Sequence, residues 1–149
     1  AALDVMARAP QVLRLALGHI DLQVDLGMAC GPDQAELAPL RWAMVLASRR
    51  AGLAAPVDGV STATGDPETL AHDTARSRRC GFGAKLCIHP AQIAGVHAAL
   101  APSAAECSWA QQVLAAAEAA AGGVCVVEGR MVDAPVIAMA HQTLQRQHI

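Results

Sequence analysis

Short apolar segments alternate with helix-length segments along this chain, and this alternation constrains its fold more than any other feature. Three apolar segments are predicted to be buried strands, namely Val12–Leu17, Leu53–Val60 and Ala84–Ile88. A segment with helix signals follows the last two directly and the first after a loop. Strands that alternate with helices in this way are typical of parallel βαβ units. The sequence therefore predicts an α/β fold built on a parallel sheet.

Residues at the helix ends define where the helices begin. Asp66 before Pro67 predicts an N-cap and a first-turn proline, and Ser103 with Glu106 has capping-box spacing. The predicted helices are Ala38–Arg50, Asp66–Arg79, Pro90–Leu100, a helix from Ser103 that stops at Gly122-Gly123, and a last helix from Asp133. On the first of them the residues expected to share the buried face are Leu40, Met44, Val45 and Ser48. Gly18–Met28 is expected to be a loop and Val124–Val127 a strand.

Composition and charge exclude several classes of protein. Alanine occupies 34 of the 149 positions, whereas Phe, Trp and Tyr supply three, so the core must be built from Leu, Val and Ala. The net charge of −2 and the scarcity of aromatic residues argue against nucleic-acid binding. No long apolar run or basic leader indicates a membrane span or a signal peptide. Five scattered cysteines without a C-x-x-C pair predict reduced thiols in a cytoplasmic protein.

Polar residues follow each predicted strand, at the edge where parallel α/β folds gather their functional side chains. These candidates are Asp21, Asp25, Asp58, Ser61-Thr62 and His89. Carboxylates at strand ends suit Mg²⁺, which binds one or two carboxylates together with waters and substrate oxygens. The alternative for Asp21 and Asp25 is that they only cap loop backbone.

Three residues, His89, Lys85 and Asp133, have competing interpretations. His89 precedes a proline at a helix start, so it can be a structural cap, a donor in a site or a proton carrier; with Cys87 alone it does not make a zinc site. Lys85 is the only lysine, which raises a Schiff-base aldolase. It lies four residues before His89, which is about 13 Å along a strand at about 3.3 Å per residue. We therefore expect Lys85 near the end of the sheet opposite to His89, in a pairing or packing role. Asp133 can be a catalytic residue or the N-cap of the last helix.

Three segments in order, G-H-I-D-L-Q-V-D-L-G, G-F-G-A-K-L-C-I-H-P-A-Q-I and E-G-R-M-V-D-A-P-V, resemble the C-terminal half of the citrate lyase β-subunit-like family. This family includes malyl-CoA and citramalyl-CoA lyases and belongs to the HpcH/HpaI aldolase superfamily. The resemblance runs from about Val12 to Leu144. It implies the last three βα units of a TIM barrel over residues 1–101 and a C-terminal helical extension, or lid, over residues 102–149 that contacts a neighbouring subunit.

The resemblance also implies roles for individual residues. Asp21 corresponds to the aspartate that binds Mg²⁺ in the G-x-x-D-L motif, and Asp133 to the aspartate that reaches a neighbouring subunit's site in a trimer or hexamer. His89 and Pro90, with the Gly81–Gly83 turn, would line the entrance for the thioester. The family's glutamate ligand and its substrate-binding arginine precede the G-x-x-D-L strand, so they are expected upstream of residue 1, in a protein longer than these 149 residues.

The leading hypothesis is a Mg²⁺-dependent carbon–carbon lyase that acts on a short 3-hydroxyacyl thioester such as citryl, malyl or citramalyl, carried by coenzyme A or an acyl-carrier protein. One rival is a thioester hydrolase of the same family. Another is a non-catalytic paralogue or fragment that keeps the barrel and the subunit contacts.

Overall fold

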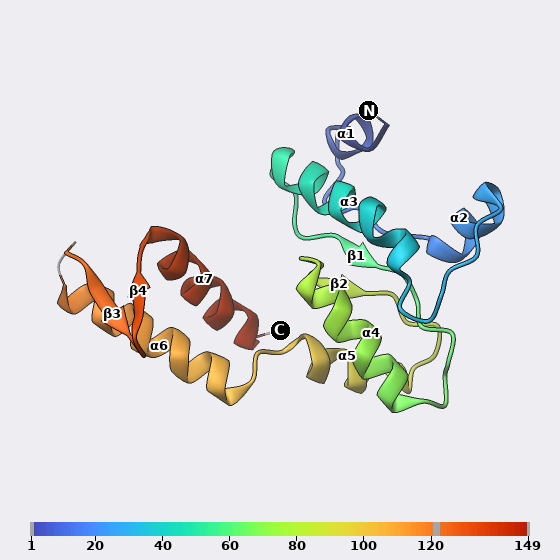
Figure 1. Ribbon diagram of the computed structural model, residues 1–149. Coiled ribbons are helices and arrows are strands. Elements are labelled where there is room, and N and C mark those ends of the chain that lie inside the picture. Colours follow the sequence, from blue (N-terminus) through green and yellow to red (C-terminus); the bar gives the residue numbers. More distant parts are fainter. Residues whose placement is uncertain (1, 121–122, 149) are drawn as a thin grey trace. The chain divides into compact units, whose positions relative to one another are not determined.

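The chain forms two compact units, residues 1–100 and 101–149. The computed structural model describes residues 2–120 and 123–148. The first unit contains α1 (Ala2–Ala7), α2 (His19–Leu26), the 3₁₀ helix η1 (Ala35–Leu37), α3 (Ala38–Arg50), β1 (Val57–Asp58), α4 (Pro67–Arg79), β2 (Ala84–Lys85) and α5 (Gln92–Leu100) (Figure 1). The second contains α6 (Ala104–Ala119), β3 (Cys125–Val127), β4 (Arg130–Val132), α7 (Ala134–Gln145) and the 3₁₀ helix η2 (Arg146–His148).

The sheet of the first unit is parallel, as predicted, but its regular strands are short. Val57 pairs with Ala84 of β2 on one side and forms a parallel bridge with Ala16 on the other. All three predicted segments therefore lie side by side, although Pro56 and Gly59 confine β1 to two residues. The fold is mixed α/β, and the described residues form no closed barrel.

The segment Gly18–Met28 is a helix, α2, and the predicted loop is wrong. Its apolar residues alternate with polar ones, so the sequence shows no stripe of helical period. The helix ends at Gly27, whose φ of 60° is the left-handed conformation that glycine adopts at helix C-termini. Backbone hydrogen bonds from Gly27 to the Val24 carbonyl and from Met28 to the Gln23 carbonyl close the last turn.

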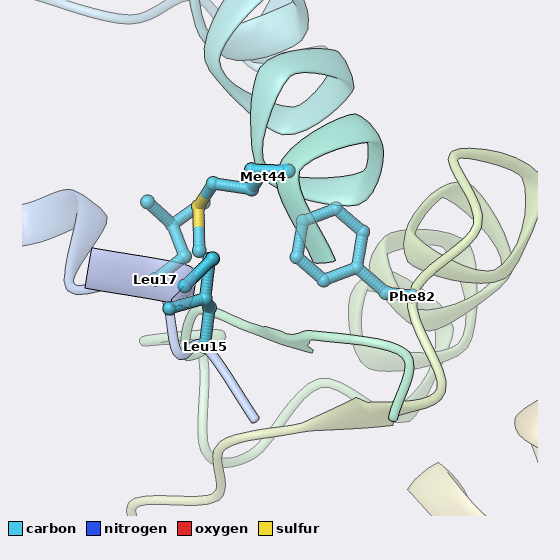
Figure 2. Close-up of a cluster of buried hydrophobic side chains, with 6 residues drawn as sticks. Leu15, Leu17, Met44 and Phe82 are labelled. Carbon is cyan, nitrogen blue, oxygen red and sulfur yellow. The ribbon is translucent and has the colours of Figure 1, made fainter. Parts of the chain in front are cut away.

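Helix α3 has the predicted bounds, but its buried face is formed by a partly different set of residues from the predicted one. Met44 and Ser48 are buried as expected, together with Arg41 and Ala47. Leu40 and Val45 are only partly buried against the core. The core beside this helix is small and is not built from Leu, Val and Ala alone, since Figure 2 shows Phe82 gathered with Leu15 and Leu17 around Met44 of α3. Its buried members are Ala7, Leu15, Leu17, Met44, Ala47 and Phe82.

Helix starts in both units follow the capping signals. Asp66 accepts hydrogen bonds from the backbone of Glu68 and Thr69, and Ser103 with Glu106 forms the predicted capping box. Helix α5 begins at Gln92 rather than Pro90, and the predicted stop at Gly122 lies outside the described residues.

The second unit is a helical pair with a β-hairpin. Helix α6 packs against α7, and β3 pairs antiparallel with β4, a strand that the sequence analysis did not predict. The buried side chains come from both helices and from the hairpin, and all are Ala or Val; they are Ala110, Val113, Val127, Val132 and Ala140. Among the described residues, no helix is long and apolar enough to cross a membrane.

Candidate functional site

Asp21, the predicted magnesium ligand, lies in the first turn of α2, just beyond the first strand segment. Its side chain is exposed, and an ideal Cβ placed on Gly18, the N-cap of α2, would lie 3.7 Å from Asp21 Oδ2. Asp25 is exposed on the last turn of the same helix. In the described part of the chain, no group of three or more His, Cys, Asp and Glu side chains is arranged to hold a metal ion. Asp21 thus offers one carboxylate.

His89 and Pro90 are exposed at the turn between β2 and α5. His89 Nδ1 accepts a hydrogen bond from the backbone N–H of Ala91 at 3.2 Å, and the Pro90 carbonyl accepts one from Ile93 at 3.1 Å. His89 therefore caps the backbone at the start of α5, which is the structural role that the sequence left open.

Asp133 is the N-cap of α7. Its side chain is exposed, and Oδ1 accepts a hydrogen bond from the backbone N–H of Val136 at 3.1 Å. The capping role is therefore present, and it uses only Oδ1 of the carboxylate.

A cavity of about 670 Å³ opens beyond the carboxyl end of β1. Ser61 and Thr62, which the strand-end rule selected, line it, whereas Asp21 and His89 do not. The other residues around it come from the turn after β1, the start of α2, the loop before η1 and the first half of α4.

Asp58, which the strand-end rule also selected, is one of the completely buried polar residues of the first unit. Its carboxylate is 0% exposed and accepts hydrogen bonds from Arg41 Nε at 3.2 and 3.3 Å, from the Gly59 N–H at 2.9 Å and from Ser77 Oγ. Burial alone raises the pKa of Asp58, but the Ser77 hydrogen bond, the Arg41 charge and the Gly59 N–H together hold the pKa below its ordinary value. Asp58 is thus a structural anion within the sheet–helix layer.

Gln34 joins this ion pair to a second one in α4. Its Oε1 accepts hydrogen bonds from Arg41 at 2.6 Å and from Arg76 at 2.9 Å. Arg76 also pairs with Asp73 at 2.9 Å, and Asp73 accepts a hydrogen bond from Ser61 Oγ. The network fixes the loop before η1 and the turn after β1, which form two walls of the cavity.

Sequence reasoning missed Arg41, Gln34 and Arg76. One signal was available, since Arg41 precedes Met44 and Ser48 at helical spacing and therefore lies on the buried face of α3. A charge in such a stripe indicates a buried partner.

Lys85 is buried opposite Asp58, at the carboxyl end of β2. The prediction that Lys85 lies near the end of the sheet opposite to His89 is wrong, because β2 ends at Lys85 rather than at Ile88. Its Nζ donates to the Gly59 carbonyl at 2.7 Å, which agrees with a pairing role. Burial lowers the pKa of Lys85, and the charges of Asp58 and Asp73 act in the opposite direction.

The chain matches the profile of the HpcH/HpaI aldolase/citrate lyase family over residues 1–90. It belongs to this family. It is 40% identical over 141 residues to a citrate lyase subunit beta-like protein of Deinococcus radiodurans, a match that covers 93% of this chain and 49% of that protein. It is 36% identical to a (3S)-malyl-CoA thioesterase of Cereibacter sphaeroides, with 95% and 50% covered.

A solved structure of a related protein has a similar fold. The crystal structure of CitE from Mycobacterium tuberculosis in complex with magnesium, acetoacetate and coenzyme A aligns with a TM-score of 0.87 at 31% identity, covering 99% of this chain and 56% of that one. The resemblance to the citrate lyase β-like family is thereby confirmed. The chain spans about half the length of the curated relatives that it matches.

Proposed function

We propose that the full-length protein is a magnesium-dependent carbon–carbon lyase that cleaves a short 3-hydroxyacyl thioester such as citryl, malyl or citramalyl. The observation that carries this proposal is the likeness to CitE, whose structure holds magnesium, acetoacetate and coenzyme A. Relatives in the same family include both citrate lyase β subunits and a malyl-CoA thioesterase. The chain would contribute one part of the site, because it spans half of these proteins.

Asp21 fits the metal as a single ligand. Its carboxylate is exposed and lies at a helix start beyond a strand end, where Mg²⁺ can bind one or two carboxylates and keep several waters. The remaining ligand would be the glutamate that the family supplies upstream. When bound, magnesium would polarise the oxygens of the substrate and stabilise negative charge that develops beside the thioester carbonyl.

Asp133 is proposed to exchange a proton with the reacting carbon or hydroxyl at the site of a neighbouring subunit. Its Oδ1 caps α7, which fixes the side chain while Oδ2 stays available. His89 and Pro90 are proposed to line the thioester entrance, and their exposure leaves them accessible to a substrate.

The substrate would be carried by coenzyme A or by an acyl-carrier protein, and the protein would assemble as a trimer or hexamer. All five cysteines are free, as expected for a protein in the reducing cytoplasm.

Thioester hydrolysis is the second candidate, because the chain is 36% identical to a (3S)-malyl-CoA thioesterase. The two reactions leave different products. A lyase divides the acyl chain and retains a shorter acyl thioester, whereas a hydrolase releases the whole acid and free coenzyme A.

The test is product analysis. The full-length protein is incubated with Mg²⁺ and malyl-CoA or citramalyl-CoA, and the acids and thioesters are separated by mass. A shortened acyl-CoA together with an equal amount of the keto acid or aldehyde acid supports the lyase. The intact hydroxy acid with free coenzyme A supports the hydrolase, and no turnover of any thioester supports a non-catalytic paralogue.

A further inference from the structure

We propose that His19 and Gly59 form a seat that fixes the first turn of α2 and thereby orients Asp21 for magnesium binding. Both would be positioning residues, because neither is proposed to touch the metal. The inference rests on the proposed role of Asp21, and it adds the contact that holds this ligand in place.

The first observation is the closeness of the His19 ring to Gly59. An ideal Cβ on Gly59 would lie 1.9 Å from His19 Nδ1 and 2.7 Å from Cε1, so only glycine leaves room for the ring. His19 is 2% exposed, and its Nδ1 has no hydrogen-bond partner in the described part of the chain. The ring is therefore held by packing on the Gly59 backbone rather than by a hydrogen bond at Nδ1.

The second observation is that Gly59 is itself fixed on both sides. Its N–H donates to Asp58 Oδ1 at 2.9 Å, and its carbonyl accepts from Lys85 Nζ at 2.7 Å. Asp58 is in turn paired with Arg41 of α3. The backbone at the end of β1 thus provides a rigid surface for the imidazole ring.

The third observation is that His19 is the buried residue of α2. Of the other apolar side chains of the helix, Ile20 is 43%, Val24 79% and Leu26 65% exposed, and Leu22 is only partly buried. Just before the helix, the Leu17 N–H donates to the Val57 carbonyl at 3.0 Å. The start of α2 is therefore held to β1 at Leu17 and His19, and Asp21 follows within the same turn.

Residues that orient a metal ligand through another group typically change metal affinity about 10–100-fold when they are altered. Gly59→Ala places a methyl carbon 1.9 Å from His19 Nδ1, far inside van der Waals contact, so the ring and the first turn must move. His19→Ala removes the anchor. In the double variant the methyl group has space, because the ring is absent. Gly65→Ala is the matched control, since a Cβ there meets no atom within 4 Å and the residue is exposed.

The experiment is calorimetric titration of Mg²⁺ into the metal-free full-length protein, with the melting temperature measured on the same samples. We expect Gly59→Ala and His19→Ala each to raise the Kd for Mg²⁺ about tenfold or more. The double variant should bind no more weakly than His19→Ala, and Gly65→Ala should bind like the wild type. If Gly59→Ala does not fold, His19→Ala and the double variant carry the test.

Two results would overturn the seat. One is a lowered melting temperature with unchanged Mg²⁺ affinity in His19→Ala, which would make the contact merely structural. The other is a double variant that binds more weakly than either single variant. Asp21→Asn tests the metal role of Asp21 separately from the positioning role of His19 and Gly59. If Asp21→Asn weakens Mg²⁺ binding while the His19 and Gly59 variants do not, only the positioning role is wrong. If the wild type does not bind Mg²⁺, or Asp21→Asn binds equally well, the metal role fails and the seat fails with it.

Discussion

Asp58 shows how a single residue ties the sheet to two helices. Its carboxylate is completely buried, yet it is satisfied by Arg41 from α3, Ser77 from α4 and the backbone of Gly59. A buried charge is tolerated only where partners replace its hydration. The residue that the strand-end rule offered as a possible ligand is thus committed to the scaffold.

Removing the charge of Asp58 should destabilise the first unit. We expect Asp58→Asn to lower the free energy of unfolding at pH 7 by about 3–5 kcal/mol, because Arg41 would remain buried without its counter-ion. Chemical denaturation of wild type and variant measures the difference. The exposed Asp25→Asn is the control, and an Asp58 variant as stable as this control would contradict the buried pair.

The effect of Asp58 should also depend on pH. Its pKa is lower in the folded protein than the ordinary 3.8, so the folded state favours the charged form. The stabilisation is therefore complete well above about pH 4 and is lost as the pH falls through the lower folded-state pKa. We predict that the stability difference between wild type and Asp58→Asn shrinks as the pH falls below about 4. A constant difference over this range would exclude the charge as its cause.

Asp133 allows capping and catalysis to be separated by one substitution. Asparagine is as good an N-cap as aspartate, so Asp133→Asn should leave α7 and the melting temperature nearly unchanged. It removes the proton acceptor, and turnover should fall roughly a hundredfold or more, as for other acid–base residues. Steady-state kinetics of the full-length variant measure this, and normal turnover would reduce Asp133 to a helix cap.

At the scale of elements, the sequence predicted best where a local signal marks a boundary. Asp66-Pro67 and the Ser103/Glu106 capping box begin helices where expected. Helix α2 was missed because its apolar residues alternate and its buried residue is a histidine, so no helical stripe exists to be found. The lengths of the strands were overestimated, because the apolar segments continue beyond the residues that pair in the sheet.

The candidate site was predictable only in part, for a related reason. Asp58 is the last residue of β1, and Ser61 and Thr62 follow it, so a positional rule finds all three. Arg41 and Gln34 belong to other segments, and their meeting at Asp58 and Arg76 depends on tertiary packing that no local pattern encodes.

The capping box of α6 gives a prediction for the second unit. Ser103 accepts from the Glu106 N–H at 3.2 Å, and Glu106 accepts from the Ser103 N–H at 2.7 Å. We expect Ser103→Ala to cost about 1 kcal/mol and to speed hydrogen exchange in the first turn of α6. Ser103→Asp should restore most of the protection, whereas protection equal to the wild type in Ser103→Ala would contradict a stabilising cap.

For the whole molecule, the decisive fact is that the chain matches about half of each relative. Its first unit has three parallel segments and an exposed Asp21, but its described residues form neither a closed barrel nor a cluster of metal ligands. The proposed activity is therefore a prediction for the full-length protein.

The most direct test of this account is the Mg²⁺ dependence of carbon–carbon cleavage in the full-length wild type, Asp21→Asn and Asp25→Asn. Each protein is freed of metal, Mg²⁺ is titrated, and formation of the shortened acyl-CoA is followed. We predict that wild type and Asp25→Asn reach the same rate at the same Mg²⁺ concentration, while Asp21→Asn remains inactive or requires far more metal. Equal Mg²⁺ dependence in Asp21→Asn and wild type would contradict the assignment of Asp21 as the metal ligand.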